Sequence, residues 1–357
     1  PTYSASWNIA KETLSDSSWL FGTGPGTYVM DYAKYRQDSV NLTTLWDARF
    51  DRSTSHIFTM LPTFGVLGTL LFLIAMFWVG SSAISQLLKT KNQEEWKMTY
   101  LAFSGWLVLA VSFFVYSWNF TLVFLFFLLS AIIIAQSPTP IKVWDFAKSP
   151  RLSLATAFMF VLSSVGLLTI LFVSLSRYGA DIAFAKAISN DQAGQPIDEV
   201  IDDLNTAVRL NRWNDVYYRN LANAQLIKLG NISVDPAVKA ADVQALVSGS
   251  INSARRSVEL SPEQVVNWSL LGDIYRNVAP IVTTADDFAI TSYQKAVELA
   301  PNNPKYYVAL GRAYLAQADL QGVLMKSEDL ATASQAKAKS DGALGSAVVN
   351  LQKAVEL

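Results

Sequence analysis

The chain of 357 residues is 51% hydrophobic and only 16% charged, which is unusual for a single soluble domain and favours a protein with membrane segments. Its net charge is −1 and its Lys and Arg residues form no basic stripe, so nucleic-acid binding is not expected. It has no cysteine, which excludes disulfides, thiolate metal sites and cysteine nucleophiles.

The apolar and charged residues are unevenly distributed along the chain. Residues 63–176 hold nearly all of the long uncharged runs, whereas residues 177–357 carry 17 of the 28 Lys and Arg residues and 20 of the 29 Asp and Glu residues. This distribution predicts a membrane part followed by a soluble part. The first residue is Pro rather than Met, and no cleavable targeting segment opens the chain, so we expect a fragment of a longer protein.

Residues 1–62 are rich in aromatic side chains, and their first segment, SASWNIAKETLSDSSW, predicts a short helix from its apolar spacing. The following GTGPGTY ends that helix, because Gly22, Gly24 and Gly26 permit positive φ and Pro25 cannot continue a helix. It is not a P-loop, since no Gly-Lys-Ser/Thr follows. A turn between two interfacial helices is the favoured interpretation, and a phosphate-binding loop is the alternative.

Four uncharged apolar runs follow, each with about the length that a membrane-spanning helix needs. They predict transmembrane helices at residues 63–84, 99–117, 119–135 and 152–175. The expected fold is therefore all-α, with about four polytopic transmembrane helices ahead of the soluble part.

The distribution of Lys and Arg between the spans predicts their direction. The segment 85–98 carries Lys89, Lys91 and Lys97, and the segment 136–151 carries Lys142, Lys148 and Arg151. The tight turn at Ser117 and Trp118 carries no basic residue. The two Lys-bearing segments are therefore predicted to be cytoplasmic. Residues 1–62 and residues 177–357 are predicted to lie outside a cytoplasmic (inner) membrane.

After residue 177 the pattern changes to a helical repeat. Trp268, Leu271, Gly272 and Tyr275 have the W-x2-L-G-x2-Y spacing of the first helix of a tetratricopeptide repeat (TPR). Other positions that fit the repeat are Ala289, Tyr293, Ala296, Pro301, Tyr307, Leu310, Gly311, Tyr314, Ala347, Leu351, Ala354, Tyr218, Leu221, Ala222, Gln225, Ala254, Ser257, Pro262, Val200, Leu204 and Ala207. Small Gly or Ala residues let paired helices approach, so residues 177–357 are predicted to form a TPR solenoid.

Three residues just ahead of the first predicted span are candidates for a functional site. Guanidinium groups such as those of Arg49 and Arg52 can clamp a diphosphate at a membrane surface and stabilise it as a leaving group. The alternative is that these arginines pair with Asp47, Asp51 and lipid head groups. His56 is suited to deprotonate a sugar hydroxyl, and the alternative is a polar residue at a helix entrance.

No metal or cofactor is expected. His56 is the only histidine, and no group of Asp and Glu residues has the spacing of metal ligands.

Three segments of the first 176 residues share a characteristic order: SWNIAKETLSDSSWLFGTGPGTYVMDYAKYR, then RFDRSTSHIFTML, then the FGVLG that opens a span. This order resembles the C-terminal half of the O-antigen ligase and polymerase superfamily, here followed by TPRs. The resemblance implies a polytopic GT-C-like glycosyltransferase. Such enzymes move glycan from an undecaprenyl diphosphate donor to an acceptor outside the cytoplasmic membrane, without a metal or a nucleotide sugar.

The resemblance also implies roles for the candidate residues. Loop arginines of the family are thought to hold the diphosphate, which corresponds to Arg49 or Arg52. The family has a His-Asn pair ahead of the span, and at the position of that histidine, counted back from Gly65, this sequence has Thr54. His56 lies two residues later.

Two hypotheses follow from the sequence. The first is a membrane ligase or polymerase of lipid-linked glycan, with Arg49 and Arg52 at the donor diphosphate, His56 as base, and the TPRs recruiting an acceptor or a partner protein. The second is a non-enzymatic membrane anchor that displays a TPR scaffold for envelope assembly.

Overall fold

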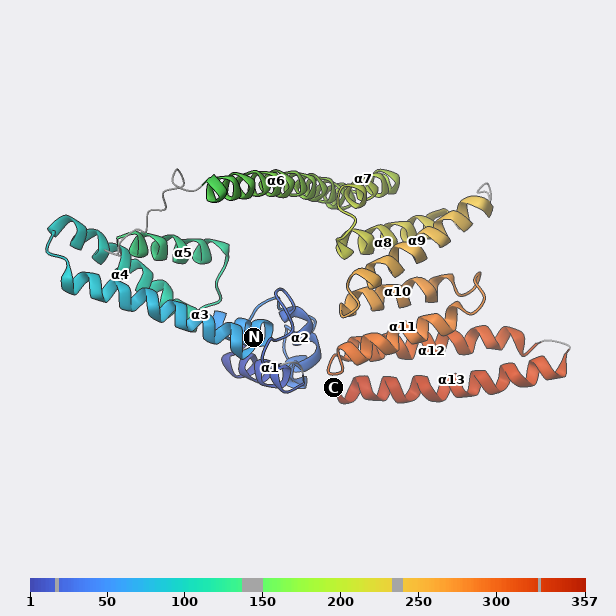
Figure 1. Ribbon diagram of the computed structural model, residues 1–357. Coiled ribbons are helices and arrows are strands. Elements are labelled where there is room, and N and C mark those ends of the chain that lie inside the picture. Colours follow the sequence, from blue (N-terminus) through green and yellow to red (C-terminus); the bar gives the residue numbers. More distant parts are fainter. Residues whose placement is uncertain (17–18, 137–149, 233–239, 327–328) are drawn as a thin grey trace. The chain divides into compact units, whose positions relative to one another are not determined.

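The computed structural model describes residues 1–16, 19–136, 150–232, 240–326 and 329–357 (Figure 1). Within these ranges the regular structure is helical and no β-strand occurs, as the all-α prediction requires. The chain forms two compact units, the first built mainly from Pro1–Lys142 and the second from Val143–Leu299 and Pro304–Leu357.

The first unit begins with two short α-helices and a 3-10 helix and continues with three apolar α-helices. Its helices are α1 (Tyr3–Asp16), α2 (Tyr28–Tyr35), the 3-10 helix η1 (Asp38–Leu42), α3 (His56–Lys89), α4 (Gln93–Val115) and α5 (Phe120–Ala135). α3 and α4 are long and apolar enough to cross a membrane. α5 has 16 residues, which at 1.5 Å per residue gives about 24 Å, less than a hydrocarbon core of about 30 Å.

The core of α3, α4 and α5 is built from aromatic rings. The ring of Phe72 on α3 lies 5.1 Å from that of Phe113 on α4, and Phe126 on α5 lies 5.6 Å from Trp106 on α4. The indole of Trp106 donates a 2.9 Å hydrogen bond to the Ser130 hydroxyl. Helices that are apolar on every face thus pack through a few large rings, and their remaining apolar surface is left exposed.

The second unit is a series of helix pairs. Its helices are α6 (Pro150–Gln192), α7 (Ile197–Leu210), α8 (Asp215–Ile232), α9 (Ala240–Leu260), α10 (Val265–Val278), α11 (Ala285–Leu299), α12 (Pro304–Leu324) and α13 (Leu330–Glu356). The strongest packing is within the pairs α6/α7, α8/α9, α10/α11 and α12/α13. This arrangement is the helical solenoid that the repeat pattern predicts.

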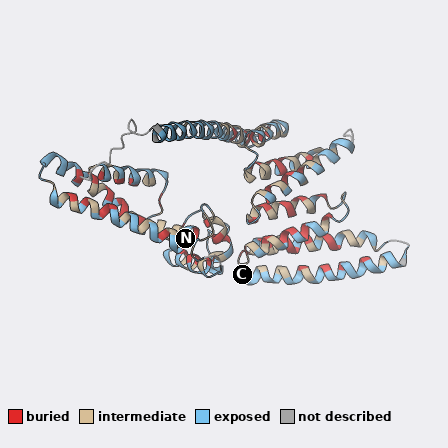
Figure 2. Ribbon diagram, viewed as in Figure 1, coloured by how far each residue is buried: buried red, intermediate tan, exposed pale blue. Residues whose placement is uncertain are grey.

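α6 combines two environments in one helix of 43 residues. Its stretch from Ser153 onward is the third described helix that is apolar and long enough to span a membrane, and its first half is exposed in the chain (Figure 2). Its second half packs against α7, with Ala180 and Ala187 buried. The boundary predicted between residues 176 and 177 therefore lies inside a continuous helix.

Lys142 and Lys148, on which the predicted direction of the spans partly rests, lie outside the described residues. The direction of the spans stays a prediction.

Candidate functional site

The apolar helix α3 is interrupted at Gly65, which has φ 67° and ψ −175°. The interruption exposes backbone groups that a regular helix would satisfy internally, and an apolar medium cannot satisfy them. The loop after α1 does so instead. The amides of Thr23 and Gly24 donate to the carbonyls of Pro62 and Thr63, at 2.9 and 2.8 Å.

Two more backbone hydrogen bonds run in the opposite direction across this contact. Val66 donates to the Trp19 carbonyl at 2.9 Å, and Leu67 donates to the Leu20 carbonyl at 3.1 Å. The loop 19–24 and the break 62–67 are thus held together by four backbone hydrogen bonds. We call this contact the loop–helix junction.

Glycine is required on both sides of the loop–helix junction. Gly22 has φ 72°, and a Cβ built there would lie 2.5 Å from the Gly65 nitrogen. A Cβ built on Gly65 would lie 2.6 Å from the Gly22 nitrogen. Both contacts are with backbone atoms, which cannot rotate away. The positive φ expected for Gly22, Gly24 and Gly26 is confirmed.

A buried carboxylate secures the loop side of the junction. The Thr23 hydroxyl donates to Asp31 Oδ2 at 2.8 Å, and the Thr27 hydroxyl donates to the Gly24 carbonyl at 2.6 Å. Asp31 is 5% exposed and lies in α2, so the helix after the glycine loop holds that loop in place. These contacts agree with a structured turn between two helices, the interpretation favoured from the sequence.

His56 is the first residue of α3, and its ring lies among aromatic side chains. The imidazole stacks on Trp118 with centroids 5.2 Å apart and an interplanar angle of 18°, and its edge-to-face contact with Phe113 is 5.5 Å. Its amide donates to the Tyr116 carbonyl at 3.0 Å. These contacts join the start of α3 to the turn between α4 and α5, and the ring is half-buried.

Thr54, the residue at the position where the family resemblance would place a histidine, contacts α1. Its hydroxyl hydrogen-bonds the Pro1 carbonyl and lies 3.2 Å from the Ser6 hydroxyl. This position therefore serves packing between the loop and α1.

The two candidate arginines lie on the exposed loop ahead of α3. Arg52 forms a bidentate ion pair with the neighbouring Asp51, with Nε to Oδ1 at 3.0 Å and an Nη to Oδ2 at 2.8 Å. These hydrogen bonds lower the pKa of the Asp51 carboxyl. Arg49 is also exposed. The contacts seen for Arg52 and His56 are with different partners, so the structure does not show these two side chains joined in one hydrogen-bonded site.

A cavity of about 450 Å³ between α1, α2 and η1 contains a residue that sequence reasoning missed. Arg36 lines it, is only 3% exposed, and donates to the Trp46 carbonyl at 2.7 Å and to the Asn41 side chain. Tyr32, 2% exposed, also lines the cavity. The only signal in the sequence is that Arg36 directly follows the amphipathic segment Tyr28–Tyr35.

An apolar groove of about 890 Å³ lies between α3 and α4. Its walls include Phe77, Gly80, Trp106, Leu107 and Phe114. A Cβ on Gly80 would lie 3.3 Å from the Trp106 ring, so the absence of a side chain at position 80 leaves room for that indole in the groove wall. The groove is lined almost entirely by apolar side chains, which suits a hydrocarbon chain.

No group of three or more His, Cys, Asp or Glu side chains that could hold a metal is found in the part of the chain that the structure describes.

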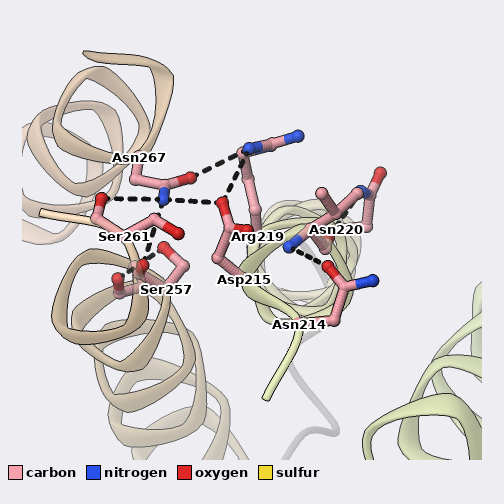
Figure 3. Close-up of polar contacts among 9 residues, drawn as sticks. Asn214, Asp215, Arg219, Asn220, Ser257, Ser261 and Asn267 are labelled. Atoms are coloured by element: carbon pink, nitrogen blue, oxygen red, sulfur yellow. Dashed lines mark hydrogen bonds and ion pairs between the residues drawn. The ribbon is translucent and has the colours of Figure 1, made fainter. Parts of the chain in front are cut away.

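In the second unit, a buried asparagine links three helices. Asn267 of α10 is fully buried, and its amide donates to Asp215 of α8 at 2.9 Å and to the Ser257 carbonyl of α9 at 3.0 Å (Figure 3). Its oxygen accepts a 2.9 Å hydrogen bond from Arg219, which also pairs with Asp215 at 3.4 Å. This network aligns one helix pair with the next.

The expected glycine contact of the repeats is also present. A Cβ on Gly272 of α10 would lie 2.8 Å from the ring of Tyr293 on α11. That ring is held by its hydroxyl, which donates to Asp273 at 2.6 Å. Burial and the neighbouring Asp273 carboxylate raise the pKa of Tyr293.

Comparison with known families supports the repeat assignment. A family model described as TPR repeat matches residues 287–317, which include most of α11 and the first part of α12. A search of curated proteins found no match to the chain. The TPR prediction is therefore confirmed for these residues, and TPRs commonly bind other proteins.

Proposed function

We propose that this chain is part of a membrane-embedded ligase or polymerase of lipid-linked glycan, and that its TPR array binds an acceptor or a partner protein. The loop–helix junction is the observation that carries the proposal. The G-x-G-P-G segment and the FGVLG segment, on which the family resemblance rests, come together there: Gly22 lies directly against Gly65. Four backbone hydrogen bonds between residues 19–24 and residues 62–67 hold this contact. A helix that only anchors a scaffold needs no break in its apolar part and no loop to fill that break.

Two other features support a lipid-linked anionic substrate. The groove between α3 and α4 is apolar and suits the hydrocarbon part of such a donor. Arg49 and Arg52 are exposed on the loop just ahead of α3, where a diphosphate at the membrane surface is within the reach of guanidinium groups. In this proposal Arg52 exchanges Asp51 for the diphosphate, and His56 is the candidate base.

A second candidate function is a membrane-anchored TPR scaffold without enzymatic activity. The packing of the His56 ring against Phe113 and Trp118 favours the scaffold, because a general base must instead lie within hydrogen-bond reach of the substrate proton that it removes. Thr54 favours the scaffold as well, because the position at which the family has a histidine is occupied here by a threonine that contacts α1 and offers no base.

Transfer of lipid-linked glycan in cells that lack their own ligase distinguishes the two functions. The gene that encodes this chain is expressed with Arg49→Ala, Arg52→Ala or His56→Ala, and Lys11→Ala is the matched control because Lys11 is an exposed cation on α1. We expect transfer by the wild type and by the control, and losses of about 10²-fold or more when a charge-stabilising group is removed. Unchanged transfer in all three variants would refute the site, and no transfer by a well-expressed wild type would favour the scaffold.

A further inference from the structure

The turn between α7 and α8 lies beside the point where the apolar part of α6 ends. α7 packs antiparallel to the second half of α6, so its last residue, Leu210, returns to the level of Ser176. The Ser176 hydroxyl donates to the Leu210 carbonyl at 2.9 Å. A Cβ on Gly179 would lie 3.5 Å from a methyl group of Leu210. The turn that follows is therefore held close to the end of the apolar run.

The length of that run fixes where the membrane surface would be. No residue from Leu154 to Leu175 is charged, and 22 residues at 1.5 Å each cover about 33 Å, close to a hydrocarbon core of about 30 Å. When this run spans a bilayer, Ser176 and Arg177 lie at the head-group level. The α7–α8 turn then lies at the same level.

The side chains at this level are those that membrane interfaces prefer. Trp213 in the turn and Tyr178 on α6 are each 66% exposed. The Arg212 guanidinium lies 5.6 Å from the centre of the Trp213 ring. Amphipathic aromatic rings concentrate at membrane–water interfaces, and arginines beside them interact with lipid phosphates. An exposed Trp, Tyr and Arg here need a partner with both apolar and anionic character.

The distribution of charge along the α6–α7 hairpin also favours contact between the α7–α8 turn and a membrane surface. Its end near Ser176 carries the exposed arginines Arg177, Arg209 and Arg212. Its opposite end carries the exposed acidic residues Asp191, Asp198 and Glu199. The acidic groups near the basic end are engaged within the protein, because Asp181 accepts from the Tyr217 hydroxyl and Asp215 pairs with Arg219. The hairpin thus presents its positive end to the level at which anionic lipid head groups would lie.

We infer that Asn211–Asn214, together with Arg177 and Tyr178, forms a surface by which the TPR array rests on the head groups of an anionic bilayer. This inference rests on the proposed membrane location of the chain. The contact gives the array a second attachment beside the α6 helix itself and fixes the first helix pair against the membrane surface.

Site-specific labelling tests this contact, because the chain has no cysteine and a single introduced thiol is unique. Three variants of the 357-residue chain, Val173→Cys, Trp213→Cys and Ile281→Cys, carry a bimane label and are reconstituted in vesicles of phosphatidylcholine and phosphatidylglycerol. Nitroxide lipids then quench the labels. Ile281 is the matched control, because it lies in another turn of the array and is 62% exposed against 66% for Trp213.

We expect head-group nitroxides to quench the label at position 213 at least about twofold more than the label at 281, as an interfacial position requires. Arg212→Glu should reduce this difference in vesicles that contain phosphatidylglycerol. The matched charge reversal Lys337→Glu, at an exposed position of α13, should not reduce it.

Two negative outcomes have different meanings. Equal quenching at 213 and 281, while acyl-chain nitroxides quench the label at 173, would overturn the surface contact and leave the membrane span intact. Absence of quenching at 173 would overturn the membrane location of α6, and with it the inference.

Discussion

Substitution of Gly65 by Ala is the most direct perturbation of the loop–helix junction. Gly65 has φ 67° and ψ −175°, a conformation that is essentially confined to glycine and costs other residues about 1–3 kcal/mol. The added methyl group would also lie 2.5 Å from the Leu20 carbonyl carbon and 2.6 Å from the Gly22 nitrogen. The loop must therefore move away from the helix.

That movement would lengthen hydrogen bonds that cross the junction. Four backbone hydrogen bonds connect residues 19–24 with residues 62–67. Each contributes about 0.5–1.5 kcal/mol net, so the loss of two removes about 1–3 kcal/mol. Together with the backbone strain, Gly65→Ala should lower the free energy of unfolding of the first unit by about 2–6 kcal/mol.

The assay is reversible unfolding of the purified chain in detergent micelles, with two further glycine substitutions as a graded series. Gly26 has φ 82° but open space around it, so Gly26→Ala isolates the backbone strain, about 1–2 kcal/mol. Gly166 is helical with open space, so Gly166→Ala should be neutral or slightly stabilising. A loss for Gly65→Ala no larger than that for Gly26→Ala would refute the tight contact between loop and helix.

Three further predictions concern packing and protonation. Gly272→Ala should cost about 1–3 kcal/mol in thermal unfolding of the array, because its methyl group meets the Tyr293 ring at 2.8 Å, whereas Gly230→Ala, with open space, should not. Asn267→Ala should cost about 2–4 kcal/mol, since it removes hydrogen bonds to the buried Ser257 carbonyl and to the partly buried charged groups of Asp215 and Arg219. A loss below 1 kcal/mol, about the contribution of one ordinary hydrogen bond, would contradict this. Burial raises the pKa of Tyr28 to about 12. The contribution of this buried, neutral phenol to the free energy of unfolding is therefore complete below pH 10 and is lost as the pH rises to about 12. The loss should be about 2–3 kcal/mol, and alkaline unfolding curves of Tyr28→Phe should lack it.

Local patterns in the sequence predict the helices of this chain well. The segment before the glycine loop forms α1, and each predicted apolar run lies largely within one of the helices α3 to α6. The repeat positions fall on α7 to α13, except Pro262 and Pro301, which lie in turns between helices. These features depend on periodicity, helix breakers and length, all of which are visible within a short window. The contact between Gly272 and Tyr293 follows from the repeat spacing for the same reason.

The break at Gly65 depends on a contact that no short window contains. A glycine within an apolar run is compatible with a regular helix, and its partner loop lies about 40 residues earlier in the sequence. Pro62, three residues before, is the only local sign of an interruption. The continuity of α6 was missed because the composition changes near Arg177, and such a change predicts a boundary between two parts. A change from an apolar surface to repeat packing does not require the helix to end.

In the candidate site, too, local features could be predicted from the sequence and contacts with distant residues could not. The positions of Arg49 and Arg52 ahead of an apolar helix, and of His56 near its start, could be predicted, because they follow from the order of residues along the chain. Their partners could not, since His56 stacks on a ring 62 residues later. Arg36 was missed because its burial results from the fold of the loop around it and leaves no periodic pattern.

The continuity of α6 bears on both candidate functions. A TPR array joined to a span by a flexible linker would sample many orientations, and its distance from the membrane would vary with linker length. Here the helix that carries the apolar run also forms half of the first helix pair, with Ser176 bonded to Leu210 at the transition. A partner bound to the array is thereby held within a restricted volume next to the apolar helix, which raises its effective concentration there. A glycan ligase needs this for its acceptor, and a scaffold needs it for the components that it assembles. Flexibility introduced at Ser176 should therefore impair either function, whereas substitutions at Arg52 should impair only the ligase.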